Sequence, residues 1–181
     1  MGEESTIYWL SADWTIAQVS ASWDAIAVAN EGPKAIAEQV VGRPLREFVH
    51  GDTSWMWVET VLSVVHHLGR PKVRPYRCDT PTHRRFMTMT VEPWDTGLQV
   101  THRTDRTEPL AQPVDVRFAN GAGAADLLRC SVCNRVQVNA HWIEPDVYAQ
   151  TFDLSTLHVQ HVVCDDCLQA PLGSPGEDST R

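Results

Sequence analysis

The 181-residue sequence contains no apolar run near the roughly eighteen residues that a membrane-spanning helix needs. Its first five residues are Met-Gly-Glu-Glu-Ser, which lack the basic start of a secretory signal. Basic residues are fewer than acidic ones, with 15 Lys and Arg against 23 Asp and Glu, so the formal net charge is −8. These shortages argue against membrane insertion, secretion and general nucleic-acid binding, and they predict a cytoplasmic protein.

Recognisable catalytic motifs are also missing. The sequence has no phosphate-binding loop, no kinase core, no acidic cyclase motif and no His-Asp-Ser set. Hydrophobic residues make up 43% of the chain, which is enough for a globular core, and the length suits one ordinary domain with a small appendage. We therefore expect a protein that is not an enzyme.

Cysteine is rare, yet four of the five cysteines fall into two identically spaced pairs, Cys130 with Cys133 and Cys164 with Cys167. Two thiolates separated by two residues can bind one ion from a single tight turn. Two such pairs complete a tetrahedral zinc shell and leave no position for a substrate. The sequence thus predicts a structural zinc site, which must enclose a small folded unit because the pairs lie further apart than in most zinc ribbons.

Other uses of these cysteines remain open on the sequence alone. Two disulfides would require an oxidising compartment, a redox-active site normally needs one such pair, and an iron–sulfur cluster also accepts four cysteines. Three histidines lie nearby, His141, His158 and His161. We expect them at the surface or behind the ligands, with His161 as the reserve metal ligand.

Hydropathy patterns in the first hundred residues predict two strands, then several helices, then three strands. The expected strands are 7–10, 15–20, 73–77, 84–92 and 98–103, and the expected helices are about 20–30, 34–39, 46–49 and 53–67. This order predicts an α+β fold in which helices pack on one face of a five-stranded antiparallel sheet.

Besides this element order, individual residues of the chain resemble those of a known family. They are Val19-x3-Trp23, Val41 to Leu45, Tyr76 to Pro81, Arg84 to Met89, Cys130 to Val136, Trp142, Glu144, Tyr148 and His161 to Cys167. With these residues the chain resembles a bacterial group of PAS-domain proteins that carry a C-terminal segment with two Cys-x-x-Cys pairs. Val162 stands where the group usually has Gly, and Asp165-Asp166 where Pro is frequent, but neither departure removes a metal ligand.

The resemblance implies a particular domain organisation. Residues 1–108 would form a PAS sensory domain, and residues 128–170 would form a small zinc-stabilised α+β module of the treble-clef kind. Residues 109–127, which include prolines and glycines, would connect them. The polar tail, residues 171–181, is expected to be disordered.

The resemblance also implies a sensor or signalling adaptor, whose PAS domain binds a small ligand, which the sequence does not identify, or a protein partner. The partner would be a signalling protein such as a histidine kinase or response regulator, or a second copy of the chain. The residues expected to line a ligand pocket are Phe48, Trp55, Val58, Leu62, Met87, Met89 and His102. The same residues would serve equally well as plain core.

Two alternatives to this sensor stay open, namely a ligand-free interaction scaffold and a haem or iron–sulfur redox sensor. A haem would take His66, His67 or His102 as its axial ligand. A flavin photosensor needs a reactive cysteine in a helix motif, which Cys78 does not fit.

Residues 70–85 differ from the acidic remainder because they hold six Lys and Arg and one acid, Asp79. We interpret these charges as solvated strand edges that discourage strand pairing between molecules. The alternative interpretation is a docking face for an acidic partner.

Overall fold

The structure is a computed structural model of the chain, and it describes residues 5–29, 35–119 and 127–175. The chain folds into two compact units. The first comprises Met1–Arg74, Thr88–Thr104 and Pro171–Arg181, and the second comprises Pro75–Met87 and Asp105–Ala170. Each unit therefore combines segments that are distant in the sequence.

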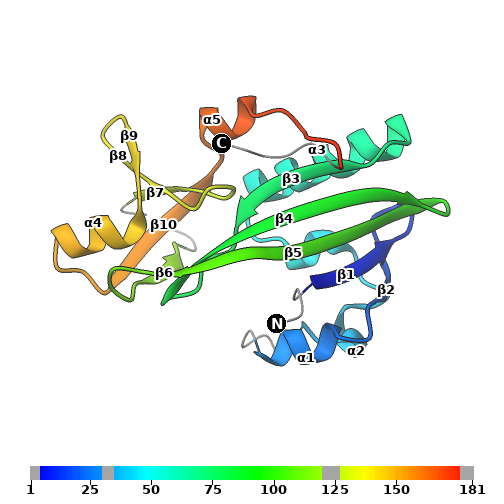
Figure 1. The fold of residues 1–181 in the computed structure, drawn as a ribbon, viewed down its shortest axis with the longest axis horizontal. Helices are drawn as coiled ribbons and strands as arrows, with labels where there is room; N and C mark the ends of the chain where they lie inside the picture. Colours follow the sequence, from blue (N-terminus) through cyan, green and yellow to red (C-terminus); the bar gives the residue numbers. More distant parts are fainter. Residues whose placement is uncertain (1–4, 30–34, 120–126, 176–181) are drawn as a thin grey trace. The chain divides into compact units, whose positions relative to one another are not determined.

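The first unit is built on a five-stranded sheet with the strand order β2-β1-β5-β4-β3 (Figure 1). The strands are β1 (Ser5–Leu10), β2 (Ile16–Val19), β3 (Lys72–Arg77), β4 (His83–Trp94) and β5 (Gly97–Pro109). β1 pairs antiparallel with both of its neighbours, so that Tyr8 lies opposite Val19 and opposite Val100. The predicted α+β class with a five-stranded antiparallel sheet is confirmed. The ends of β3, β4 and β5 within residues 75–87 and 105–109 belong to the second unit.

Helices connect β2 to β3 along the chain. They are α1 (Trp23–Ala29), α2 (Ala37–Val40), the 3-10 helix η2 (Leu45–Phe48) and α3 (Asp52–Leu68). α3 ends at Gly69, whose φ of 62° is left-handed and whose N–H donates to the Val65 carbonyl, as glycine at a helix end allows. Gly51 holds the N-cap position of α3, and Asp52 pairs with Arg46 at 2.6 Å. No helix in the described parts of the chain is both long and apolar enough to cross a membrane.

Alternate residues of the strands supply much of the core of the first unit. Successive side chains of a strand point to opposite faces, so the pattern in β4 and β5 predicts which residues are buried. Val91, Leu98 and Val100 are fully buried, and Met89 is nearly so. The buried residues of β1, β2 and α3 are Tyr8, Leu10, Ile16, Val61, Leu62 and Val65.

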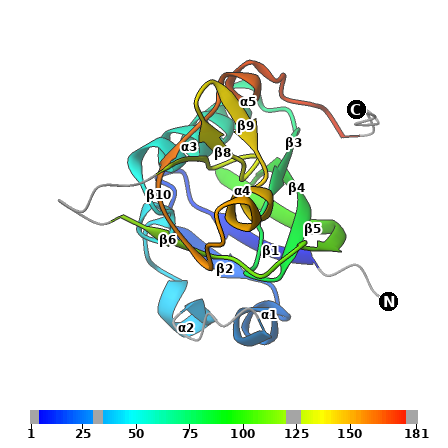
Figure 2. The ribbon, with the colours of Figure 1, turned by 90° about the vertical axis from the view of Figure 1, so that its left-hand side faces the viewer.

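The second unit has its own five-stranded sheet with the order β6-β10-β7-β8-β9, and Figure 2 looks toward this unit with α4 in front. The elements are β6 (Asp115–Phe118), β7 (Leu127–Cys130), β8 (Val136–Val138), β9 (His141–Ile143), α4 (Pro145–Thr151), β10 (Thr156–Val162) and α5 (Asp165–Gln169). β10 runs parallel to β6 and β7, whereas β7, β8 and β9 are antiparallel neighbours. The predicted linker thus contributes a strand, because Val116 of β6 lies opposite Leu157 of β10.

A continuous apolar cluster fills the second unit. Its buried members are Val114, Leu127, Val136, Ala149, Leu157 and Val159. Full burial of one such aliphatic side chain stabilises a fold by about 1.5–3 kcal/mol. Because Val114 and Leu127 precede residue 128, the core of this unit extends beyond the predicted module of residues 128–170.

The first residues of the predicted tail are held against β3, an edge strand of the first sheet. The Val73 N–H donates to the Gly173 carbonyl at 2.9 Å, and the Gly173 N–H donates back to the Val73 carbonyl at 3.0 Å. Arg74 Nη1 also donates to the Pro171 carbonyl at 3.0 Å. The prediction of disorder is therefore wrong for Pro171 to Gly173, since these bonds satisfy exposed groups of the strand edge. The remainder of the tail, residues 176–181, lies outside the described residues.

Gly97 provides a test of the packing between β1 and β5. A Cβ at this position would overlap the Leu10 carbonyl oxygen and lie 2.9 Å from the Leu10 carbonyl carbon. The Gly97→Ala variant must displace one of the two strands, so we expect its free energy of unfolding to fall by about 1–3 kcal/mol in urea denaturation. The adjacent exposed residue supplies the control, because Thr96→Ala should change little. Equal denaturation midpoints for the two variants would contradict this packing.

Candidate metal centre

The strand arrangement of the second unit brings the two cysteine pairs together. β7 and β10 are parallel neighbours, and Cys130 at the end of β7 lies opposite Val162 at the end of β10. Parallel strands end at the same edge of a sheet, so the chain that leaves β10 reaches Cys164 beside Cys130. α5 then begins directly after Cys164 and carries Cys167 one turn further on.

The first pair sits on a tight turn between β7 and β8. The Asn134 N–H donates to the Cys130 carbonyl and the Cys130 N–H donates to the Arg135 carbonyl, both at 2.9 Å. Asn134 closes the turn with a φ of 61°, a left-handed conformation that asparagine tolerates better than most residues. A second strand holds the turn in place, because the Ser131 N–H donates to the Val162 carbonyl at 2.8 Å.

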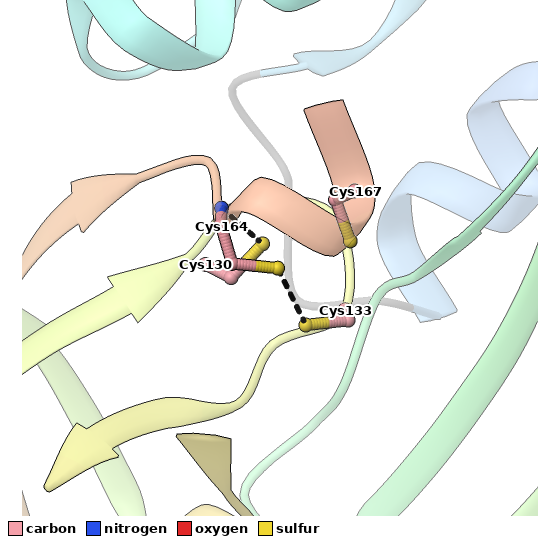
Figure 3. A group of neighbouring side chains, drawn as sticks. All are labelled: Cys130, Cys133, Cys164 and Cys167. Atoms are coloured by element: carbon pink, nitrogen blue, oxygen red, sulfur yellow. Dashed lines mark hydrogen bonds between the residues drawn. The ribbon is translucent and has the colours of Figure 1, made fainter. Parts of the chain in front are cut away.

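The four sulfur atoms converge on one point (Figure 3). All four Sγ atoms lie within 4.8 Å of one another, and those of Cys133 and Cys164 are 3.9 Å apart. Zinc–thiolate bonds of about 2.3 Å in a tetrahedron place neighbouring sulfurs about 3.8 Å apart. The separations therefore suit one tetrahedral ion, with Cys130 and Cys164 buried and the other two half-buried.

Backbone N–H groups also point at sulfur. Those of Val132 and Cys164 each lie 3.4 Å from the Cys130 Sγ. Hydrogen bonds of this kind favour a thiolate and help to orient it toward a metal. Cys130 is thus the sulfur that the fold prepares most directly for the ionised state.

Without a cation, the four cysteines cannot all be ionised at once. Hydrogen bonds from the thiols of Cys133 and Cys167 lower the pKa of Cys130. The same contacts, together with burial and the charge on Cys130, raise the pKa of Cys133 to about 12 and raise that of Cys167 as well. Four neighbouring thiolates therefore need a compensating cation, which is the role that a divalent metal ion can take.

The chemistry of the donors narrows the choice of ion. Four thiols suit zinc or an iron–sulfur cluster and do not suit magnesium or calcium, which prefer oxygen. Among the described residues, the group that could hold the ion consists of the four cysteines, so the predicted reserve ligand His161 is not part of it. His161 lies instead with Nδ1 3.1 Å from the Ser131 hydroxyl and with its ring centroid 4.1 Å from that of Phe118.

No protein-family model, curated protein or solved structure matches this chain. The interpretation of the centre therefore rests on its own donors and geometry.

The residues predicted to line a PAS ligand pocket are spread over both units. Leu62 and Met89 are buried, and Phe48, Trp55, Val58, Met87 and His102 are half-buried. Met87 belongs to the second unit, whereas the others belong to the first. Arginine side chains cover two of the aromatic rings, Arg43 at 4.9 Å from the centroid of Phe48 and Arg46 at 5.9 Å from that of Trp55.

The histidines considered as haem ligands already have neighbours in the first unit. Burial lowers the pKa of His102 to about 4, so this ring is neutral near pH 7, and it stacks on Tyr8 with a hydroxyl contact of 3.3 Å. His66 lies edge-on to Trp14, and His67 Nδ1 lies 2.8 Å from the Ser63 carbonyl. Both the PAS ligand pocket and the haem site therefore remain predictions.

The second unit contains a buried ion-pair network that the sequence did not predict. Arg77 binds Asp79 at 2.6 Å and Glu144 at 2.7 Å. Arg84 Nη2 donates to both carboxylate oxygens of Asp146, at 2.6 and 2.8 Å. The side chains of Arg77 and Asp79 are each 7% exposed and that of Asp146 is 0% exposed. The network joins the β3–β4 hairpin end to the start of α4.

The network also reaches the turn that holds the first cysteine pair. The Arg77 N–H donates to the carbonyl of Val132 at 2.8 Å, and Val132 lies between Cys130 and Cys133. Arg135, which follows the same turn, donates from Nε to Glu144 Oε1 at 3.1 Å. The β3–β4 hairpin is thus bonded both to the turn that holds Cys130 and Cys133 and to the acids beside it.

This network corrects the interpretation of residues 70–85. Arg77, Arg84 and Arg74 are not solvated strand-edge charges, since the first two are engaged with buried acids and Arg74 is 4% exposed. The sequence contained a partial indication of the acidic side of this network, because Glu144 and Asp146 flank Pro145 at the first turn of α4. The pairing itself depends on contacts between residues more than sixty positions apart.

The pKa values of Glu144 and Asp146 are lowered, which favours their ionised forms. Burial alone would raise the pKa of Asp146, but hydrogen bonds from Arg84 and from the Ala111 N–H hold it below its ordinary value. Burial opposes ionisation of Glu144 in the same way, and Arg77 and Arg135 lower its pKa. Because their folded-state pKa values are depressed, these acids stabilise the fold above about pH 4, and this stabilisation is lost as the pH falls further.

Asp146→Asn should therefore be strongly destabilising at neutral pH. The substitution leaves the Arg84 charge without its buried carboxylate, and we expect the free energy of unfolding to fall by roughly 3–5 kcal/mol. Urea denaturation at pH 7 and at pH 3.5 measures the effect, which should shrink at the lower pH because Asp146 of the unfolded wild-type chain then binds a proton and favours unfolding. Glu108→Gln is the control, since that acid forms an exposed pair with Arg106 and should change stability by less than about 1 kcal/mol. Similar effects of the two substitutions would show that the network contributes nothing beyond a surface pair.

Proposed function

We propose that the four cysteines bind one structural zinc ion in a non-enzymatic sensor or signalling adaptor of the PAS type. The convergence of four sulfur atoms within 4.8 Å is the observation that supports the metal. Four thiolate ligands complete the tetrahedral shell of zinc, so the ion has no position at which a substrate could bind or react. Zinc then supplies the charge that lets all four thiols ionise.

The expected role of the ion is to fasten the ends of β7 and β10 to α5. Each cysteine pair lies at the end of one of these parallel strands, and α5 has only five residues. A helix this short has little stability of its own in water. The proposed bond from Cys167 to the ion would hold it in place, in the manner of the treble-clef module that the sequence predicts.

Two observations support the PAS part of the proposal. The first unit has five antiparallel strands with its helices between β2 and β3, which agrees with the element order that the sequence predicts. The residues that carry the resemblance, Tyr76 to Pro81 and Arg84 to Met89, include the arginines of the buried network. A protein partner such as a histidine kinase or response regulator would receive the signal.

Metal content is the first test of this proposal. Protein purified without added metal should contain one zinc per chain, and its visible absorption spectrum should be featureless. Iron together with visible bands would instead support the haem or iron–sulfur sensor, and protein without any metal would refute the structural zinc. Extraction and mass spectrometry of bound small molecules then separates a ligand-binding sensor from a ligand-free scaffold.

A pair of cysteine variants makes the test specific. Cys164→Ser should lose the zinc and lower the free energy of unfolding by several kcal/mol, because metal binding is part of the folding free energy of such sites. Cys78→Ser should keep both metal and stability, since Cys78 is exposed and lies outside the sulfur cluster. Limited proteolysis should cut Cys164→Ser within residues 127–170 first. Equal zinc content in both variants would contradict the assignment of the ligands.

A further inference from the structure

The segment that follows α5, residues 171–173, forms a strap on the edge of the first sheet. Within the first unit, the N–H and the C=O of Val73 in β3 are both bonded to Gly173, and the Arg74 side chain donates to the Pro171 carbonyl. β3 lies at the edge of its sheet, where backbone groups would otherwise be open to other strands. The strap therefore covers part of this edge.

One backbone group reports whether the strap is in place. The N–H groups of alternate residues point to the same side of a strand, so residues 73, 75 and 77 belong to the outer edge of β3. Pro75 has no N–H, and the Arg77 N–H donates to the Val132 carbonyl at 2.8 Å. The Val73 N–H is therefore the donor of this edge that depends on the strap.

The strap has little hold of its own. The net free energy of one hydrogen bond is of the same order as the conformational entropy lost when one residue is ordered, so these few bonds roughly offset the ordering of residues 171–173. Apolar packing adds little, because no residue from 165 to 175 is buried, and the structure describes all of them. The last buried residues before the strap are Val163 and Cys164. The strap therefore depends on what holds the chain between residues 164 and 171.

α5 lies in that interval and is joined to the strap by a short, stiff connection. Ala170 is extended and is the one residue between the end of α5 at Gln169 and Pro171, whose ring fixes its own φ. A displacement of α5 is thus passed on to the strap. The helix has five residues, none of them buried, and it contributes Cys167 to the sulfur cluster. A metal bond at Cys167 is an interaction strong enough to fix so short a helix.

We propose that the strap covers the β3 edge only while a metal ion at the four cysteines fixes α5, so that loss of the ion opens this edge. The inference rests on the proposed zinc site. When a chelator takes the ion, Cys167 loses its bond, α5 unwinds and the effective concentration of the strap at Val73 falls. The first sheet then has an open strand edge, whose backbone groups are available for pairing. The metal centre would thereby regulate the first sheet as well as stabilise the second unit.

Hydrogen exchange at the Val73 amide tests the proposal, measured by two-dimensional NMR on the full-length chain before and after treatment with a strong zinc chelator. We expect this amide to exchange about tenfold faster or more without the metal, because it loses its acceptor. The amide of Val100, a buried residue of the central strand β5, is the control and should be unchanged. Equal Val73 exchange in the two states would overturn the proposal. Equal increases at Val73 and Val100 would also overturn it, since the whole sheet would then open.

Two pairs of variants separate the steps. Cys167→Ser removes the ligand on α5 and should speed Val73 exchange about as much as chelation does, whereas Cys78→Ser, outside the sulfur cluster, should leave it unchanged. Gly173→Pro removes the N–H that donates to the Val73 carbonyl, so it should open the edge while the zinc content stays the same. Gly173→Ala is its control, because the added Cβ would lie no closer than 3.5 Å to Val73. Slow Val73 exchange in a zinc-containing Gly173→Pro protein would contradict the strap.

Metal content separates failure of the strap from failure of the zinc site. Protein that never contains zinc would refute the zinc site and, with it, the metal dependence of the strap. Protein that binds zinc, and whose Val73 amide does not respond when zinc is removed, would refute the strap alone.

Discussion

Repulsion among four neighbouring thiolates is the constraint on which the second unit depends. The parallel pairing of β7 and β10 places Cys130 beside Cys164, and the turn after β7 and the helix α5 add Cys133 and Cys167. The resulting sulfur cluster cannot ionise fully by itself, as the raised pKa values of two of its thiols show. We infer that one divalent ion resolves this conflict, and that the strand ends, the turn and α5 keep their arrangement through it.

The buried ion pairs extend this arrangement to the β3–β4 hairpin. Arg77 contacts the turn between Cys130 and Cys133 through its backbone and Glu144 through its side chain, while Arg84 holds Asp146 at the start of α4. Ion pairs of this kind often add little net stability, because desolvation offsets much of the attraction between the charges. We infer that their main effect is on specificity, since any other arrangement of hairpin and helix would leave buried charges unpaired. The arginines of the β3–β4 hairpin and the first cysteine pair, which both belong to the family resemblance, are thus joined by one set of contacts.

The elements that could be predicted from the sequence are those with local signals. Alternation of apolar residues located the strands that bury Met89, Val91, Leu98 and Val100, and the Cys-x-x-Cys spacing identified the cluster of four cysteines. The charged stretch at residues 70–85 was misjudged because exposed and buried arginines look alike in sequence, and the acids Glu144 and Asp146 that pair with Arg77 and Arg84 lie more than sixty residues away. The role of residues 115–118 as a strand, and the bridge between Gly173 and Val73, likewise depend on partners that local patterns do not reveal.

X-ray absorption at the metal edge of the purified protein tests the four-thiolate zinc site. We expect a zinc edge and a first shell of four sulfur atoms at about 2.3 Å. Nitrogen or oxygen neighbours at about 2.0–2.1 Å in that shell would show that at least one of the four cysteines is not a ligand. An iron edge, or protein that contains no metal at all, would contradict the structural zinc site itself.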